Sequence, residues 1–119
     1  MPRLALEMDF SFSAAHRLPC YSGRCFNLHG HNYKLTVRVE GEPDPKTGMF
    51  LDYGDLEKAA KAAVLDRCDH ANLNDFVDNP TAENLVVWMW PRLREKLPGL
   101  TEVRLWETRE CCVVYRGDP

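Results

Sequence analysis

The sequence predicts an α+β fold in which two helices cover one face of a four-stranded antiparallel sheet. Three observations lead to this prediction. Apolar residues recur with a period of two near both ends of the chain, they recur at helical spacing in the middle, and turn-forming residues separate these segments. The predicted order is strand, strand, helix, helix, strand, strand (ββααββ). With 119 residues, the chain is expected to form one domain, residues 1–119.

The first two strands are predicted over residues 4–14 and 31–41. In both segments apolar side chains alternate with small or polar ones, which is typical of a strand with one buried face. The apolar positions are Leu4, Leu6, Met8, Phe10 and Phe12 in the first, and Tyr33, Leu35, Val37 and Val39 in the second. The segment 41–48, rich in Gly and Pro, ends the second strand.

Two helices are predicted in the middle of the chain. Residues 55–67 carry apolar side chains at helical spacing, which indicates an amphipathic helix. Thr81 is expected to be the N-cap of the second helix, which Pro98-Gly99 ends. Pro91 lies inside that second helix and is expected to kink or split it.

The last two strands are predicted over residues 101–109 and 111–116. The predicted sheet then has two open edges and only two helices to cover it. Because open edges can pair with another chain, we expect the protein to form a homo-oligomer through its sheet.

Composition excludes several classes of function. The chain is 45% hydrophobic and 28% charged, with a formal net charge of −3. It has no basic stripe, so no nucleic-acid partner is expected. It has no run of about 18 apolar residues, so no membrane association is expected. The N-terminal residues do not resemble a signal peptide, and the expected location is the cytoplasm.

The histidines point to a metal site. The chain has four histidines, and His29 and His31 are two residues apart at the start of the second predicted strand. Their imidazoles would therefore leave the same face of the sheet, as a pair of zinc ligands does. If the first two strands form a hairpin, His16 lies at the same end. Three histidines with an open fourth position are typical of catalytic zinc; alternatively, His16 is a strand-end residue bonded to backbone.

Cys25 allows two interpretations. As a fourth ligand it would close a structural metal site, whereas as a free thiol close to the metal it would act as a base or nucleophile. Three residues separate it from His29, and this spacing does not decide between the two. The chain has five cysteines, and in the cytoplasm they are expected to stay reduced. Cys68, Cys111 and Cys112 are expected to be small core or interface residues.

Two further groups could carry chemistry. Asp69 precedes His70, and such a pair can serve as an acid–base dyad, although a solvated loop histidine is the simpler interpretation. Glu107 lies on the apolar parity of a predicted strand. A carboxylate there needs a partner, such as the N–H groups of a planar heterocycle, unless it lies at the strand end in water.

Taken together, these motifs resemble the 6-pyruvoyltetrahydropterin synthase family. They occur in the family's order and span residues 10–116. The segments that carry the resemblance are Phe12-Ser13-Ala14-Ala15-His16-Arg17-Leu18, Cys25-x3-His29-Gly30-His31-Asn32-Tyr33, Leu51-Asp52-Tyr53, Asp69-His70-x2-Leu73-Asn74, Asn79-Pro80-Thr81-x-Glu83 and Glu107-Thr108.

The resemblance implies a tunnelling fold, in which trimers close their sheets into a barrel and two trimers stack into a hexamer. It implies a Zn²⁺ site at His16, His29 and His31. It also implies roles for other residues: Cys25 as the catalytic proton acceptor, Asp69 and His70 as its partner dyad from a neighbouring subunit, and Glu107 with Thr108 as residues that bind the pterin substrate.

The spacing between Cys25 and His29 implies a particular branch of the family. Members that form 6-pyruvoyltetrahydropterin have a longer gap, whereas the three-residue gap resembles bacterial 6-carboxytetrahydropterin synthase of queuosine biosynthesis. Leu28 stands where a folate-related branch has Glu. The expected reaction converts 7,8-dihydroneopterin triphosphate and water to 6-carboxy-5,6,7,8-tetrahydropterin, acetaldehyde and triphosphate. The alternatives are 6-pyruvoyltetrahydropterin synthase and a non-catalytic pterin- or purine-binding zinc module.

Overall fold

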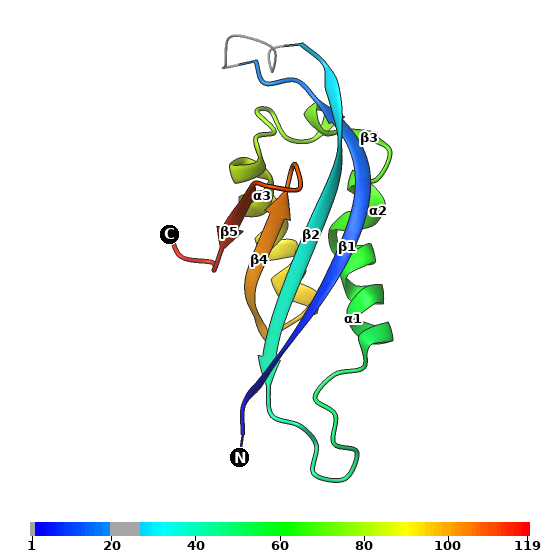
Figure 1. Cartoon of the computed structure of the whole chain (residues 1–119), viewed down its shortest axis with the longest axis vertical. Coiled ribbons are helices and arrows are strands. Elements are labelled where there is room, and N and C mark those ends of the chain that lie inside the picture. Colours follow the sequence, from blue (N-terminus) through cyan, green and yellow to red (C-terminus); the bar gives the residue numbers. More distant parts are fainter. Residues whose placement is uncertain (1, 20–26) are drawn as a thin grey trace.

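A long twisted sheet, covered on one face by helices, dominates the computed structural model, which describes residues 2–19 and 27–119 (Figure 1). The strands of this sheet lie in the order β3-β1-β2-β4-β5. They are β1 (Leu4–His16), β2 (His29–Gly41), β3 (Ala71–Asn72), β4 (Leu100–Trp106) and β5 (Cys112–Tyr115). This arrangement agrees with the predicted α+β class and with the prediction that two helices cover one face of the sheet.

The prediction of four antiparallel strands needs correction. The sheet has five strands, because the two-residue strand β3 pairs in parallel with β1 at Ala14 and Ala15. The pairing of β3 with β1 is caused by the two residues that precede β3, Asp69 and His70. The His70 N–H donates to the Ser13 carbonyl (2.6 Å), and the Ser13 N–H donates to Asp69 Oδ1 (3.0 Å). These two bonds hold the chain after the first helix against the edge of β1.

The first helical segment runs without a break from residue 53 to residue 68. It comprises α1 (Tyr53–Ala60), a π-helical stretch η2 (Lys61–Leu65) and α2 (Asp66–Cys68). Asp52 caps it by accepting from the Gly54 N–H at 2.7 Å. The predicted helix over 55–67 therefore begins two residues earlier, and its π-helical stretch has no counterpart in the sequence pattern.

The second helix, α3 (Ala82–Lys96), follows a short 3₁₀ turn, η3 (Leu73–Asp75). Thr81 is its N-cap, as predicted, and accepts from the Asn84 N–H at 3.0 Å. Pro91 does not split the helix. Proline removes the hydrogen bond to the carbonyl four residues earlier, which here belongs to Val87. Both residues lie on the exposed face, where water can satisfy that carbonyl.

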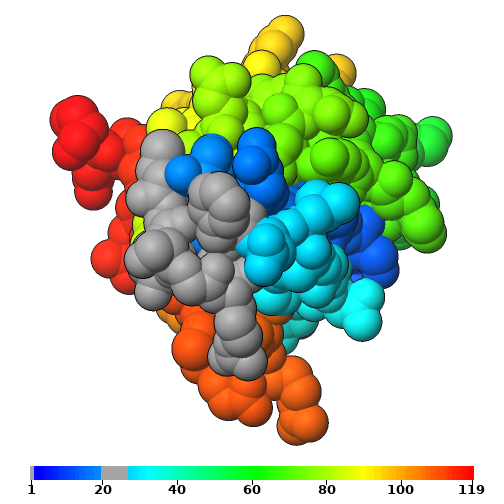
Figure 2. Space-filling view, turned by 90° about the horizontal axis from the view of Figure 1, so that it is seen from above, coloured from blue at the N-terminus to red at the C-terminus, as the bar shows by residue number. Residues whose placement is uncertain are grey.

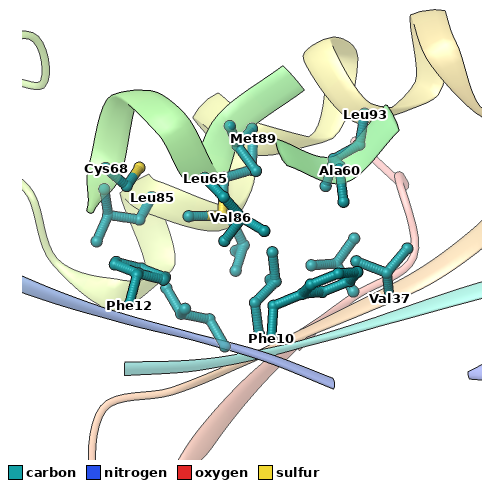
Figure 3. Close-up of a cluster of buried hydrophobic side chains, with 14 of the residues drawn as sticks. Phe10, Phe12, Val37, Ala60, Leu65, Cys68, Leu85, Val86, Met89 and Leu93 are labelled. Atoms are coloured by element: carbon teal, nitrogen blue, oxygen red, sulfur yellow. The ribbon is translucent and has the colours of Figure 1, made fainter. Parts of the chain in front are cut away.

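The core lies between the helices and one face of the sheet. Figure 3 shows Phe10, Phe12 and Val37 rising from the strands toward side chains from both helical segments, among them Leu65, Leu85, Val86, Met89 and Leu93. All of these are at most 8% exposed. None of the helices in the described ranges is long and apolar enough to span a membrane.

The pairing of β1 with β2 determines which residues meet at the end of the sheet where β1 ends and β2 begins. The two strands are antiparallel, with Leu4 opposite Gly41 at one end and His16 opposite His29 at the other. Because side chains alternate between faces, the parity that buries Phe12 and Tyr33 also directs His16, His29 and His31 to the helix-covered face.

Leu35 tests the core at its centre, because it is fully buried on the middle strand β2. We expect Leu35→Ala to lower the free energy of unfolding by about 2–5 kcal/mol, since it removes apolar contacts and leaves a cavity. Urea unfolding followed by circular dichroism measures this. The matched control is Val114→Ala at a side chain that is 40% exposed, which should cost less than about 1 kcal/mol. Equal losses for both variants would contradict this account of the core.

Candidate metal centre

Three histidines meet at the end of the sheet where β1 ends and β2 begins. Figure 2 looks onto this end, with the green segment after α2 and the orange turn after β4 on opposite sides of the blue and cyan strand ends. The possible ligand atoms of His16, His29 and His31 all lie within 4.8 Å of one another. Their ring centroids are 4.6–5.1 Å apart. The convergence predicted from a hairpin is therefore present.

Hydrogen bonds to backbone carbonyls fix the orientation of two of these rings. His16 Nδ1 lies 2.7 Å from the Pro80 carbonyl oxygen, and His29 Nδ1 lies 2.7 Å from the Asn27 carbonyl oxygen. A carbonyl only accepts, so in each neutral ring Nδ1 carries the proton and Nε2 keeps its lone pair. Metal-binding histidines are commonly held in this way.

The Nε2 atoms of the three histidines are arranged to bind a cation. His16 Nε2 lies 3.0 Å from His29 Nε2. If both Nδ1 atoms donate to carbonyls, no proton lies between the two Nε2 lone pairs, and they repel unless a positive ion lies between them. Among the described residues, the buried His31 Nε2 has no hydrogen-bond partner. The three rings therefore fit a divalent metal ion bound through imidazole nitrogen.

The surroundings keep His31 in its neutral form. Burial lowers its pKa; the charge of Glu107 opposes this, whereas His16 and His29 lower it further. His16 is completely buried, and the Tyr33 hydroxyl lies 3.2 Å from its Nδ1. Burial, followed by the charge of Glu107, raises the pKa of Tyr33, so this hydroxyl stays protonated.

Glu107 adjoins the three histidines. It follows β4 and places Oε1 3.8 Å from His31 Nε2, with 31% of its side chain exposed. It also lines a cavity of about 180 Å³ with the first turn of α3 at Ala82 and Glu83. Thr108 does not share this cavity. It lines another one, with Trp106 and Arg109.

Asp69 and His70 form a close pair on the edge of β1. His70 Nδ1 lies 3.1 Å from Asp69 Oδ1. The Ser13 N–H bond, followed by the charge of His70, holds the pKa of Asp69 below its usual range. His70 has a φ of 60°, a left-handed backbone that is uncommon for residues other than glycine. Its side chain is 82% exposed and lines a cavity of about 410 Å³ that also reaches His31.

The sequence interpretation missed several groups that build this site. The carbonyls of Pro80 and Asn27 orient two histidines, and a backbone carbonyl leaves no signal in a sequence. Asn74 fixes the chain after β1, because its side chain accepts from the Arg17 N–H and donates to the Arg17 carbonyl, both at 2.8 Å. The repeated polar residues after Asp69 could have indicated such a clamp. Cys25 and Cys20 lie outside the described residues.

Comparisons with known proteins bear on this site. A model of the 6-pyruvoyl tetrahydropterin synthase family matches residues 5–118. The chain belongs to this family. Human 6-pyruvoyl tetrahydrobiopterin synthase is 40% identical, with 91% of this chain and 88% of the human protein covered. Dihydroneopterin monophosphate aldolase of Pyrococcus furiosus is 42% identical, with 84% of this chain and 86% of that protein covered.

A solved structure extends the similarity to the fold. The 6-pyruvoyl tetrahydropterin synthase of Caenorhabditis elegans superposes with a TM-score of 0.89 at 35% identity, covering 99% of this chain and 98% of that one. The family expected from the sequence motifs is therefore confirmed.

Removing one histidine should strongly weaken metal binding. We expect His16→Ala to weaken Zn²⁺ affinity by more than about 100-fold, because a fixed nitrogen ligand is lost. Competition with a chromophoric chelator measures the affinity. His29→Ala serves as a second ligand variant at a less buried position. His70→Ala is the matched control, since this exposed side chain is outside the three-histidine group. Unchanged affinity in both ligand variants would rule out this metal centre.

Proposed function

We propose that the protein is a zinc-dependent lyase that converts 7,8-dihydroneopterin triphosphate and water to 6-carboxy-5,6,7,8-tetrahydropterin, acetaldehyde and triphosphate, a step of queuosine (7-deazapurine) biosynthesis. Membership of the family and the three-histidine centre support a reaction on a pterin. The observation that carries the choice of product is the three-residue gap between Cys25 and His29.

A second candidate is 6-pyruvoyltetrahydropterin synthase, which eliminates triphosphate and retains the three-carbon side chain. The specific observation in its favour is the name of the human relative, 6-pyruvoyl tetrahydrobiopterin synthase, at 40% identity. The similar protein from Pyrococcus furiosus is named as an aldolase at 42% identity. Relatives with different names thus have comparable identity, and overall identity does not choose between products.

The three histidines would hold the metal through imidazole nitrogen. When bound, Zn²⁺ supplies Lewis-acid polarisation of the side-chain hydroxyls of the substrate. His16 and His29 are oriented by carbonyls, and His31 is kept neutral by burial. The rings of His16 and His29 are therefore already oriented for the ion, and His31 favours the neutral form that a metal ligand needs.

Glu107 would hold the pterin ring. Its carboxylate accepts hydrogen bonds only, and the ring offers paired N–H groups to a two-pronged acceptor. With Oε1 at 3.8 Å from His31 Nε2, a ring held there has its substituents beside the metal ligands. This is a positioning effect. Thr108, which is expected from the resemblance to share this role, lines a different cavity, so within one chain Glu107 alone carries this part of the proposal.

Proton transfer would involve Cys25 on one side and the Asp69–His70 pair on the other. Asp69 remains ionised and orients His70 through the 3.1 Å contact. Because 82% of the His70 side chain is exposed, the pair is well placed to serve the site of an adjoining subunit. We therefore extend the proposal to an oligomer in which trimers form a barrel and two trimers form a hexamer.

The remaining expectations belong to the same proposal. Residues 1–119 would form a single domain, and the enzyme would act in the cytoplasm on a small-molecule substrate, with neither nucleic acid nor membrane as partner. Net charge of −3 and ordinary globular composition support this.

Product analysis tests the choice of reaction. We expect the zinc-loaded protein, incubated with 7,8-dihydroneopterin triphosphate, to release acetaldehyde and 6-carboxy-5,6,7,8-tetrahydropterin, both detected by mass spectrometry. The His16→Ala variant is the control for metal-independent breakdown of the substrate. Formation of the pyruvoyl product without any carboxy product would overturn the first candidate in favour of the second.

Replacement of Cys25 tests its role as a base. We expect Cys25→Ala to lower kcat by about 100- to 10,000-fold, the usual contribution of a positioned proton acceptor, while zinc content stays stoichiometric. Steady-state kinetics and metal analysis measure the two quantities. Cys20→Ala is the matched control in the same segment. Loss of zinc together with thermal stability would show instead that Cys25 is a ligand, and the proposed catalytic site would then be wrong.

A further inference from the structure

Tyr33 carries a buried hydroxyl group to which the proposed reaction gives no role. Its side chain, on the helix-covered face of β2, is 1% exposed. The ring stacks on Phe12, with centroids 4.9 Å apart and planes inclined by 8°. A phenylalanine ring would pack in the same way, and burying a hydroxyl costs free energy unless it has a hydrogen-bond partner. Tyrosine at this position therefore indicates a role for the hydroxyl beyond packing.

The hydroxyl is directed at one of the three histidines of the metal centre. Tyr33 Oη lies 3.2 Å from His16 Nδ1, its one hydrogen-bond partner within residues 2–19 and 27–119. The Tyr33 ring also lies edge-to-face with two imidazoles. Its centroid is 6.1 Å from that of His16 and 5.5 Å from that of His31, with interplanar angles of 89° and 74°. Tyr33 thus adjoins two of the candidate metal ligands and shares a hydrogen bond with one of them.

The imidazole is the donor in this hydrogen bond. His16 Nδ1 also lies 2.7 Å from the Pro80 carbonyl oxygen, and because a carbonyl only accepts, Nδ1 carries the proton. The Tyr33 oxygen is then a second acceptor for the same N–H, as in a three-centre hydrogen bond. Acceptors of this kind fix the tautomer and the orientation of a ligand imidazole, and they raise the basicity of the nitrogen that binds the metal.

We propose that Tyr33 is a positioning residue of the metal centre, whose hydroxyl acts with the Pro80 carbonyl to hold His16 in the orientation and tautomer that a divalent ion needs. The proposal rests on the metal-binding part of the proposed function and on no step of the pterin reaction. It is independent of subunit assembly, because Tyr33 and His16 are both buried within one chain.

The variant Tyr33→Phe tests this role, because it removes the oxygen and keeps the ring. We expect it to weaken Zn²⁺ affinity by about tenfold, near the lower end of the roughly 10- to 100-fold typical of such partners, since the Pro80 carbonyl still accepts from Nδ1. Competition with a chromophoric chelator measures the affinity. The visible absorption spectrum of the Co²⁺-loaded protein reports the geometry of the ligands without reference to turnover, and we expect its bands to shift.

Two control variants separate this effect from other causes. Tyr115→Phe makes the same chemical change at a partly buried ring that packs against Trp90, and it should alter neither the affinity nor the spectrum. Val37→Ala truncates a fully buried side chain on the same face of β2 as Tyr33. It should lower the free energy of unfolding and leave Zn²⁺ affinity unchanged.

An unchanged affinity and spectrum in Tyr33→Phe would overturn the proposal while leaving the metal centre in place. A loss of affinity in Val37→Ala as large as that in Tyr33→Phe would assign the effect to general destabilisation, and would also overturn it. If the unsubstituted protein bound no Zn²⁺, the metal centre itself would be wrong, and the role of Tyr33 with it.

Discussion

His16 lies opposite His29 because β1 and β2 keep one antiparallel register from Leu4–Gly41 to the end of the hairpin. A shift by one residue would move every side chain of one strand to the other face. The same register buries Phe12 against Tyr33, whose rings stack with centroids 4.9 Å apart. The apolar pattern that builds the core therefore also determines where the imidazoles meet, and the metal centre depends on the hairpin as a whole.

The site combines buried imidazoles, which are favoured when neutral, with the carboxylate of Glu107. A buried imidazole is favoured when neutral, and carbonyls that accept from Nδ1 prepare His16 and His29 for a cation without adding charge. Glu107 brings the only nearby negative charge among the described residues that influence His31. The centre can thus accept a divalent ion while one carboxylate on its rim remains free for hydrogen bonding.

Much of this could be predicted from the sequence, and the failures have physical causes. Alternation over residues 4–14 and 31–41 predicts the two long strands, whose pairing as a hairpin the structure adds. Thr81 is recognisable as a cap because its hydroxyl serves the first turn. Strand β3 has two residues, too few to show any period, and it depends on side-chain and backbone bonds at Ser13. Pro91 is expected from the sequence to disturb α3. The helix continues because the hydrogen bond that proline removes is the one to the Val87 carbonyl, on the exposed face of the helix. The histidine centre was accessible to sequence reasoning because three ligands of one type share one end of a hairpin.

The contact of Asp69 and His70 with Ser13 has a consequence for aggregation. Sheet edges present unpaired N–H and C=O groups that recruit strands from other molecules. At Ser13 both groups are already bonded, the N–H to a carboxylate and the carbonyl to the His70 N–H, and β3 occupies Ala14 and Ala15. A foreign strand that adds to this edge of β1 must therefore stop before the histidines. Asp69 and His70 thus occupy the backbone groups of Ser13 that an added strand would need at the histidine end of this edge.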